Sequence, residues 1–187
     1  DMGENTVLWN EFSPVCYQMD VILTQGEKTS AFSARFGMRN LSTSGSVLMN
    51  NGDRIYLRGT LECCIFPLTG TPPTDKEGWN KVFSVAKAYG LNHLRFHSWC
   101  PPQAAFEVAD DMGFYLQVEL PLWSLTVGKD TTTNRFLYEE ADRILKEYGN
   151  HPSFCLMSVG NELQPDFDFL NSLRSYMKSK DNRHLYT

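Results

Sequence analysis

The stretch that decides the fold is residues 151–163, which read HPSFCLMSVGNEL. Pro152 prevents a preceding helix from continuing, because proline lacks a backbone N–H and clashes inside a helix. The apolar run at residues 154–159 then predicts a strand buried on both faces. The strand gives way abruptly to the polar pair Asn161 and Glu162. Ligands bind at this end of a strand in parallel-stranded folds, so both are candidate site residues. Alternatively, Glu162 simply reaches solvent, which avoids the cost of burying a carboxylate.

Strand-like and helix-like segments alternate from residue 55 to residue 187. The strands are predicted at residues 55–64, 93–97, 115–120, 154–159 and 184–187. Helical patterns fill the intervals, with apolar residues spaced to line one face of each helix. This alternation predicts an α/β fold with a parallel sheet and helices outside it. Because a complete (β/α)8 barrel takes about 250 residues, four βα units and a fifth strand make a partial TIM barrel.

Local signals mark the ends of several elements. Thr74 with Glu77 predicts a capping box at the start of the first helix. Gly113 is expected to stop the second helix, since glycine readily adopts the left-handed conformation found after a helix C-terminus. The Asn51-Gly52 pair predicts a tight hairpin turn between two short strands.

Residues 1–45 read as β structure that precedes the α/β region at residues 46–187. Residues 17–23 alternate as a strand does, a turn follows at residues 25–28, and a second strand-like run covers residues 31–39. These strands are too few for an independent sandwich. Residues 1–45 are therefore not expected to fold as a domain of their own, and we expect residues 46–187 to be the first half of a barrel.

The composition allows a substantial core and gives no sign of a nucleic-acid partner. Hydrophobic residues make up 42% of the 187 residues, and no apolar stretch is long enough to span a membrane. The net charge of −5 and the lack of basic clusters argue against nucleic-acid binding. The chain lacks an initiator Met and a visible signal peptide, so we expect a piece of a longer polypeptide, and the sequence leaves its compartment open.

The five cysteines show no spacing typical of a metal site, and we expect neither a metal nor a cofactor: Cys16, Cys63, Cys64, Cys100 and Cys155. Three of them lie in or beside apolar strands. This position predicts buried free thiols.

Each predicted strand of the α/β region ends in polar residues, namely Glu62, Arg95 with His97, Glu119, and Asn161 with Glu162. Carboxylates that converge at one face of a barrel suit glycoside cleavage, in which one stays protonated and another stays ionised. Neighbouring carboxylates also push their pKa values apart. On residue types alone, Glu162 and Glu119 are the tempting pair, because their strands are adjacent. Alternatively, Glu119 is buried against a cation such as Arg95.

Two tryptophans, Trp99 and Trp123, each follow a predicted strand, where loops build a site. Aromatic faces stack on sugar rings, and they also fill protein cores. Both interpretations stay open for each of the two residues.

Asn-His-Pro-Ser at residues 150–153, the apolar strand and Gly-Asn-Glu at residues 160–162 together resemble the fourth barrel strand of glycoside hydrolase family 2. That family includes β-galactosidases, β-glucuronidases and β-mannosidases. The resemblance implies that Glu162 is the catalytic acid/base and that Asn161 contacts the sugar near its 2-hydroxyl. Residues 8–14 and 35–39 resemble the end of the family's immunoglobulin-like domain, which precedes the barrel. The resemblance implies that residues 1–45 are the last strands of such a β-sandwich domain.

The resemblance also changes the interpretation of the other candidates. The family's nucleophile is a Glu on barrel strand seven, beyond the strands predicted here, so Glu119 is expected to shape the sugar site instead. The family usually has Asp-Glu where this chain has Val118-Glu119. His97 follows Arg95 by two residues where the family has three, which changes the face it points to and makes it a sugar ligand or a supporting hydrogen-bonder. Glu62 with the two following cysteines replaces a polar, His-rich stretch.

The sequence therefore predicts a retaining exo-β-glycosidase that cleaves O-glycosidic bonds in carbohydrates, present without its nucleophile. We expect a carbohydrate substrate, no nucleic-acid or membrane partner, and either the remainder of a parent chain or self-association through open barrel edges. The resemblance favours a periplasmic or secreted location. One alternative is a non-catalytic carbohydrate-binding or structural half-barrel. Another is an unrelated barrel enzyme with Glu162 as a base, which would normally show a phosphate loop or metal cluster that this sequence lacks.

Overall fold

The computed structural model describes residues 2–164 and 166–187. Its centre is a five-stranded sheet in the order β10-β9-β8-β7-β6, in which every neighbouring pair is parallel. The strands are β6 (Gly59–Glu62), β7 (His93–Phe96), β8 (Tyr115–Glu119), β9 (Phe154–Ser158) and β10 (Leu185–Tyr186). Spatial order follows chain order, which short crossover connections between parallel strands produce. The predicted α/β fold with a parallel sheet is confirmed.

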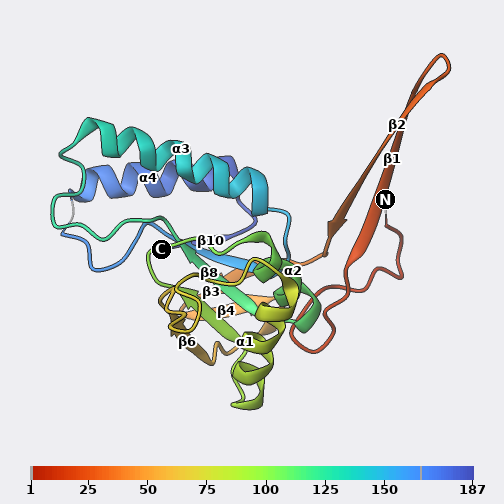
Figure 1. Ribbon diagram of the computed structural model, residues 1–187, viewed down its shortest axis with the longest axis horizontal. Helices are drawn as coiled ribbons and strands as arrows, with labels where there is room; N and C mark the ends of the chain where they lie inside the picture. The colour runs from red at the N-terminus through yellow and green to blue at the C-terminus, as the bar shows by residue number, and fades with distance from the viewer. Residues whose placement is uncertain (1, 165) are drawn as a thin grey trace.

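A helix follows each of the first four strands of this sheet. The helices are α1 (Lys76–Ala88), α2 (Gln103–Met112), α3 (Thr131–Tyr148) and α4 (Phe167–Lys180). α3 and α4 lie side by side (Figure 1), and the end of α3 packs against α2, where Tyr148 stacks on Phe106. The predicted inward faces are buried, with Phe106 of α2, Leu137 of α3 and Met177 of α4 in one hydrophobic core. Helices packed on a buried sheet explain why all five residues of β9 are buried.

Of the two predicted helix ends, the C-terminal end of α2 is confirmed and the N-terminal cap of α1 is wrong. The predicted capping box of Thr74 and Glu77 is wrong: α1 begins one residue later, and the Asp75 carboxylate accepts the Gly78 N–H at 2.8 Å. Asp is as effective an N-cap as Ser or Thr, so the residue next to the first helical turn takes the role. Gly113 ends α2 as predicted, in the left-handed region at φ +69°.

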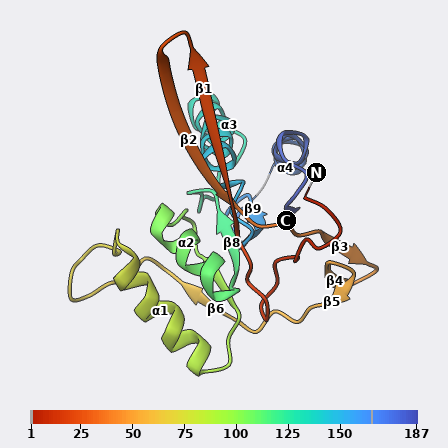
Figure 2. The ribbon, with the colours of Figure 1, turned by 90° about the vertical axis from the view of Figure 1, so that its right-hand side faces the viewer.

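The N-terminal strands form two separate antiparallel sheets. β1 (Tyr17–Gln25) and β2 (Lys28–Phe36) make a long hairpin that projects from the body of the molecule (Figures 1 and 2). β3 (Leu41–Ser44), β4 (Val47–Asn50) and β5 (Asp53–Arg54) form a three-stranded sheet. The predicted Asn51-Gly52 turn joins β4 to β5 with positive φ at both residues, as a two-residue hairpin turn of this type requires.

The predicted strand at residues 55–64 is wrong at both ends. Residues 53–54 pair with β4, and the parallel sheet begins only at Gly59. Between them, Ile55 N–H still donates to Leu48 O, whereas Arg58 N–H donates to the side chain of Asn92. The backbone therefore changes partner within this segment. The apolar pattern did not reveal that change.

The cysteine prediction is confirmed in part. All five thiols are free, and Cys155 on β9 is buried. Cys63 and Cys64 are exposed, which contradicts the predicted burial. The reason is that β6 ends at Glu62, so both residues lie in the following loop. Cys16 and Cys100 are half-buried.

Residues near the N-terminus are tied to the parallel sheet by buried contacts. Trp9 is fully buried, donates its indole N–H to Asp110 O at 2.9 Å, and packs edge-on against Tyr115 of β8. Arg39 donates to the main-chain oxygens of Pro152 and Phe154 at the start of β9. Among the described residues, no helix is long and apolar enough to cross a membrane.

Candidate active site

Glu119 is the most buried charged group at the carboxyl edge of the sheet. It is the last residue of β8 and its side chain is 0% exposed. Arg95 of β7 donates Nε–H to Oε1 at 2.5 Å, and the Ser98 backbone N–H donates to Oε2 at 2.8 Å. Both carboxylate oxygens thus have a donor, which a buried carboxylate requires. Of the two interpretations of Glu119, the structure shows the pairing with Arg95.

Arg95 links this carboxylate to the next strand end. Its Nη2 donates to Asn161 Oδ1 at 2.6 Å, and the Asn161 side chain lies just past β9. Because a guanidinium only donates hydrogen bonds, the contact fixes which way the amide faces. Asn161 Nδ2 is buried and has no hydrogen-bond partner among the described residues. The arrangement leaves one fixed N–H donor group buried and without a partner among the described residues.

Gly160 allows the chain to make this bend after β9. Its φ is +145°, and a Cβ built on it would lie 2.4 Å from Leu122 O. Asn161 N–H donates to that same Leu122 O at 3.0 Å. A side chain at position 160 would therefore push the loop after β8 away from the Asn161 backbone.

Glu162 follows immediately, at the same edge of the sheet. Its side chain is exposed, and its φ of +48° lies in the left-handed region that non-glycine residues seldom adopt. No hydrogen bond to its carboxylate is found among residues 2–164 and 166–187. Among the candidate carboxylates, Glu162 is exposed, whereas Glu119 is buried.

Two further candidates, His97 and Trp123, contact each other. Their rings meet edge-to-face with centroids 5.2 Å apart. Trp123 is 64% exposed, so its indole face is available for stacking. Trp99 differs, because it is partly buried and packs against Phe96 and Trp79 in the aromatic core. Of its two interpretations, the structure shows the core-filling one.

Glu62 is the last residue of β6, and its backbone contacts other residues at the carboxyl edge of the sheet. Its carbonyl accepts the His97 N–H at 2.9 Å and the Trp99 indole N–H at 3.4 Å. Its carboxylate accepts the Cys64 N–H at 3.0 Å, while Oε2 is buried without a partner in the described chain. Burial raises the pKa of this carboxyl.

The chain was compared with protein families, curated proteins and solved structures. No protein-family model matches the chain. A Formosa agariphila protein named provisionally as a β-glucuronidase is 27% identical over 173 residues, which cover 88% of this chain and 20% of the relative. The β-galactosidase of Lactococcus lactis is 24% identical over 168 residues, which cover 84% of this chain and 16% of that enzyme.

A solved structure shares the fold. The family 2 β-galacturonidase of Eisenbergiella tayi, bound to galacturonate, superimposes with a TM-score of 0.85 over 98% of this chain and 34% of its own, at 16% identity. The chain is glycoside hydrolase family 2-like. The chain spans about a fifth of the length of these two curated relatives, both of which are named as glycosidases.

Ser98 contributes to this candidate site and was not identified from the sequence. Ser98 supplies the backbone N–H that holds Glu119, and its φ is +58°. Its hydroxyl is buried without a partner in the described part of the chain. The available signal was its position directly after His97, in the loop that follows a strand.

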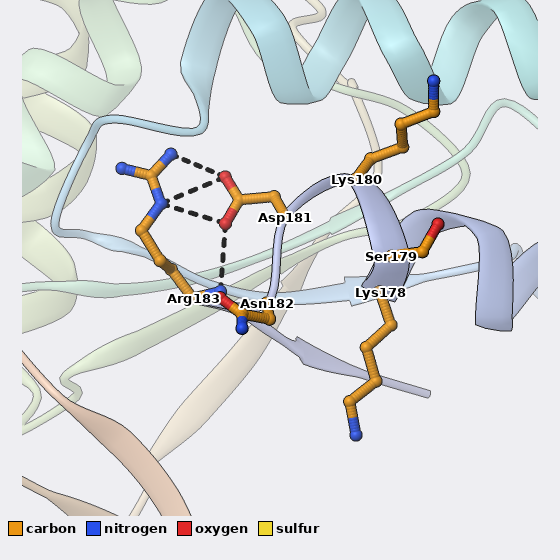
Figure 3. Close-up of a pocket in the computed structure, with 6 residues that line it drawn as sticks. All are labelled: Lys178, Ser179, Lys180, Asp181, Asn182 and Arg183. Carbon is orange, nitrogen blue, oxygen red and sulfur yellow. Dashed lines mark hydrogen bonds and ion pairs between the residues drawn. The ribbon is translucent and has the colours of Figure 1, made fainter.

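A hollow elsewhere on the family 2-like chain is not part of this site. It is lined by residues 178–183 at the end of α4, where Arg183 forks onto the Asp181 carboxylate (Figure 3). These residues lead into the amino end of β10, so they lie at the opposite edge of the sheet from Glu119. Within the described residues, no group of three or more His, Cys, Asp or Glu side chains could hold a metal ion.

Proposed function

We propose that this chain carries the acid/base part of a retaining exo-β-glycosidase that hydrolyses O-glycosidic bonds in carbohydrates. Glu162 is the acid/base, and Asn161 binds a sugar hydroxyl beside the bond that breaks. The observation that supports the proposal most is the fixed Asn161 amide next to an exposed Glu162. Glycosidase relatives that cover most of this chain point to the same reaction.

The buried network explains how Asn161 would be positioned. Glu119 fixes Arg95, and Arg95 fixes the amide oxygen of Asn161, so the free Nδ2–H keeps one direction. A preorganised donor stabilises a transition state without reorganising during the reaction. The role of Glu119 is therefore to position other groups, and the residue that attacks the sugar must be supplied elsewhere.

Retaining hydrolysis needs a second carboxylate about 5–5.5 Å from the acid, on the far side of the sugar carbon. Both oxygens of Glu119 are occupied by Arg95 and Ser98, which makes it a poor nucleophile. In the proposal, the nucleophile comes from a seventh barrel strand, and the five parallel strands described here belong to the first half of a (β/α)8 barrel. Residues 1–45 are proposed to belong to an immunoglobulin-like domain.

The proposal is tested with Glu162→Gln in a longer polypeptide that contains these residues and cleaves aryl glycosides. Loss of a general acid should lower the rate by roughly 10²–10⁴ on substrates with poor leaving groups. Activated nitrophenyl glycosides need little protonation, so their glycosylation step should slow far less. Glu27→Gln, in the exposed turn between β1 and β2, is the matched control and should leave both rates unchanged.

An equal loss on both substrate types would count against the acid role of Glu162. Sugar binding without turnover in every longer polypeptide would favour a non-catalytic half-barrel instead. Isothermal titration with the free sugar separates these outcomes, because it measures binding in the absence of a reaction.

A further inference from the structure

Two adjacent exposed thiols stand at the edge of the candidate active site and have no part in the proposed reaction. Cys63 and Cys64 directly follow β6, and both side chains are exposed. Cys64 adopts a φ of +56°, and its N–H is held by the Glu62 carboxylate at 3.0 Å. The thiols therefore sit on a turn that hydrogen bonding keeps in one shape.

The covalent geometry of neighbouring residues disfavours a disulfide between these thiols. Consecutive Cα atoms across a trans peptide are about 3.8 Å apart, whereas disulfides usually join Cα atoms about 4.4–6.8 Å apart. The described residues contain no cis peptide. A disulfide here would be strained and easily reduced, so the free dithiol is the stable form.

The other three cysteines cannot imitate this pair. Cys155 is buried, and burial raises the pKa of its thiol to about 11. Burial likewise raises the pKa of the half-buried Cys16 to about 11 and that of Cys100 far above its usual range, and burial with the nearby Glu62 also raises the pKa of Cys64, so the pKa does not set the pair apart. None of the three has another cysteine beside it in the chain, so none offers two sulfurs on one turn.

We propose that Cys63 and Cys64 form a dithiol site that captures trivalent thiophilic ligands, with a trivalent arsenical as the defining probe. In the reaction, two arsenic–oxygen bonds of R–As(OH)2 are replaced by two arsenic–sulfur bonds. Each thiol proton leaves with one hydroxyl as water, and arsenic stays trivalent. The arsenic atom lies between the two sulfurs, so the ring that forms contains one more atom than the ring of a disulfide. The larger ring is less strained, and arsenic can therefore bridge two sulfurs for which a direct bond would be strained.

Binding of an arsenical to Cys63 and Cys64 would affect residues at the candidate active site. The Glu62 carboxylate holds Cys64 N–H, and the Glu62 carbonyl holds the Trp99 indole N–H. Movement of the turn therefore changes the environment of Trp99. Tryptophan emission should report the binding, and Trp99→Phe should remove that part of the signal.

The test adds phenylarsine oxide to the folded 187-residue chain and follows the intact mass during competition with an excess of 2-mercaptoethanol. The original chain should retain one adduct that a dithiol, but not the monothiol, removes. Two linked sulfurs should hold arsenic about 10²–10⁴-fold more tightly than one, so Cys63→Ser and Cys64→Ser should each lose the adduct. Cys16→Ser is the matched control and should retain it.

Two results would overturn the proposed dithiol site, and a third would overturn its coupling to the active-site edge. The first is an adduct on the original chain that 2-mercaptoethanol removes as readily as from either serine variant. The second is peptide mapping of the arsenic to Cys16, Cys100 or Cys155. The third is an emission change that persists undiminished in Trp99→Phe, which would refute the coupling to the active-site edge. None of these readouts depends on glycosidase activity, so they leave the proposed function untouched.

Discussion

At the residue scale, the Glu119 carboxylate and the Arg95 guanidinium decide the geometry of the candidate site. The carboxylate is fully buried, while the Arg95 side chain is 33% exposed. Burying an ion pair is not strongly stabilising in itself, but removing one member leaves the other without compensation. The local structure therefore depends on both members of the pair, and the pair in turn holds Asn161 and the Ser98 loop in place.

Glu119→Gln should destabilise the fold by about 3 kcal/mol, at the lower end of the usual range because Arg95 keeps some contact with water. The amide replaces one acceptor with a donor, so either the Arg95 Nε–H or the Ser98 N–H loses its partner. The midpoint of urea unfolding, followed by circular dichroism at low protein concentration, measures the change.

The matched control for that change is Glu107→Gln, whose partner Lys76 is exposed. Surface pairs contribute about 0–1 kcal/mol, so this variant should unfold at almost the same urea concentration as the original chain. Equal losses in the two variants would mean that burial of Glu119 does not set its energetic role.

At the scale of elements, the loop between α4 and β10 depends on one carboxylate. Burial alone would raise the pKa of Asp181, but the His184 imidazole, whose Nε2 lies 3.3 Å from Oδ2, and hydrogen bonds from Arg183 hold it well below its usual range. Arg183 donates through Nε and Nη2, and its backbone N–H also donates to Asp181. The charged form of Asp181 thus fastens the end of α4 to the start of β10.

This pKa predicts how the loop responds to acid. Because the folded-state pKa lies below the unfolded-state value, the stabilisation is complete above the unfolded pKa, near 3.8. It is lost as the pH falls through the folded-state pKa. Asp181→Asn should cost about 1.5–3 kcal/mol at neutral pH, the usual value of hydrogen bonds to a charged group.

Amide exchange of residues 181–186 at several pH values measures that stabilisation. The original chain and the variant should converge in strongly acidic solution. A difference between them that does not shrink as the pH falls would contradict the assigned cause.

The β1–β2 hairpin has one largely apolar face and one more polar face, which also carries the Ile22–Ala31 pair. The register pairs Val21 with Phe32 and Met19 with Ala34 on one face, and Asp20 with Ser33 on the other. Both strands are exposed along almost their whole length. An isolated two-stranded hairpin is marginally stable, and an amphipathic ribbon normally packs its apolar face on another layer.

Phe32→Ser should therefore reduce self-association of the 187-residue chain. Burying a Phe side chain contributes about 1.5–3 kcal/mol, so the association constant should fall about tenfold or more. Sedimentation or light scattering over a concentration series gives that constant. Ser33→Ala, on the polar face of the same strand, should leave it unchanged, and equal effects of both variants would exclude the apolar face as the contact.

At the scale of the whole molecule, the 187-residue chain should not turn over aryl β-glycosides by itself. The described sheet supplies one exposed glutamate, Glu162, and holds Glu119 in a buried pair. β6 and β10 are the outer strands of that sheet, so their free edges favour association. Light scattering together with a panel of nitrophenyl β-glycosides tests both statements.

A stable monomer that cleaves one of these substrates would refute the expectation. If Glu119→Gln then abolished the cleavage without unfolding the chain, Glu119 would be the nucleophile. Circular dichroism of the variant makes that distinction, since loss of the fold would remove activity for a different reason.

The sequence alone determined the parallel sheet, the order of its strands and the polar residues at their ends. Apolar periodicity predicts such features well, because a strand buried on both faces must be apolar along its length and can become polar only where it stops. The run from Phe154 to Ser158, followed by Asn161 and Glu162, is the clearest case. Gly113 and Asn51-Gly52 were equally readable, since their positive φ angles restrict the residue type.

Only the tertiary structure decided which polar groups meet. Arg95 and Ser98 both donate hydrogen bonds to Glu119, and Arg95 also donates to Asn161. No local sequence pattern predicts these contacts. Trp99 and Trp123 have similar positions in the sequence, but packing partly buries Trp99 against Phe96 and leaves Trp123 exposed. Cys63 and Cys64 are exposed because hydrogen bonding ends β6 at Glu62. Contacts between distant segments set these outcomes, and hydrophobic pattern carries little information about them.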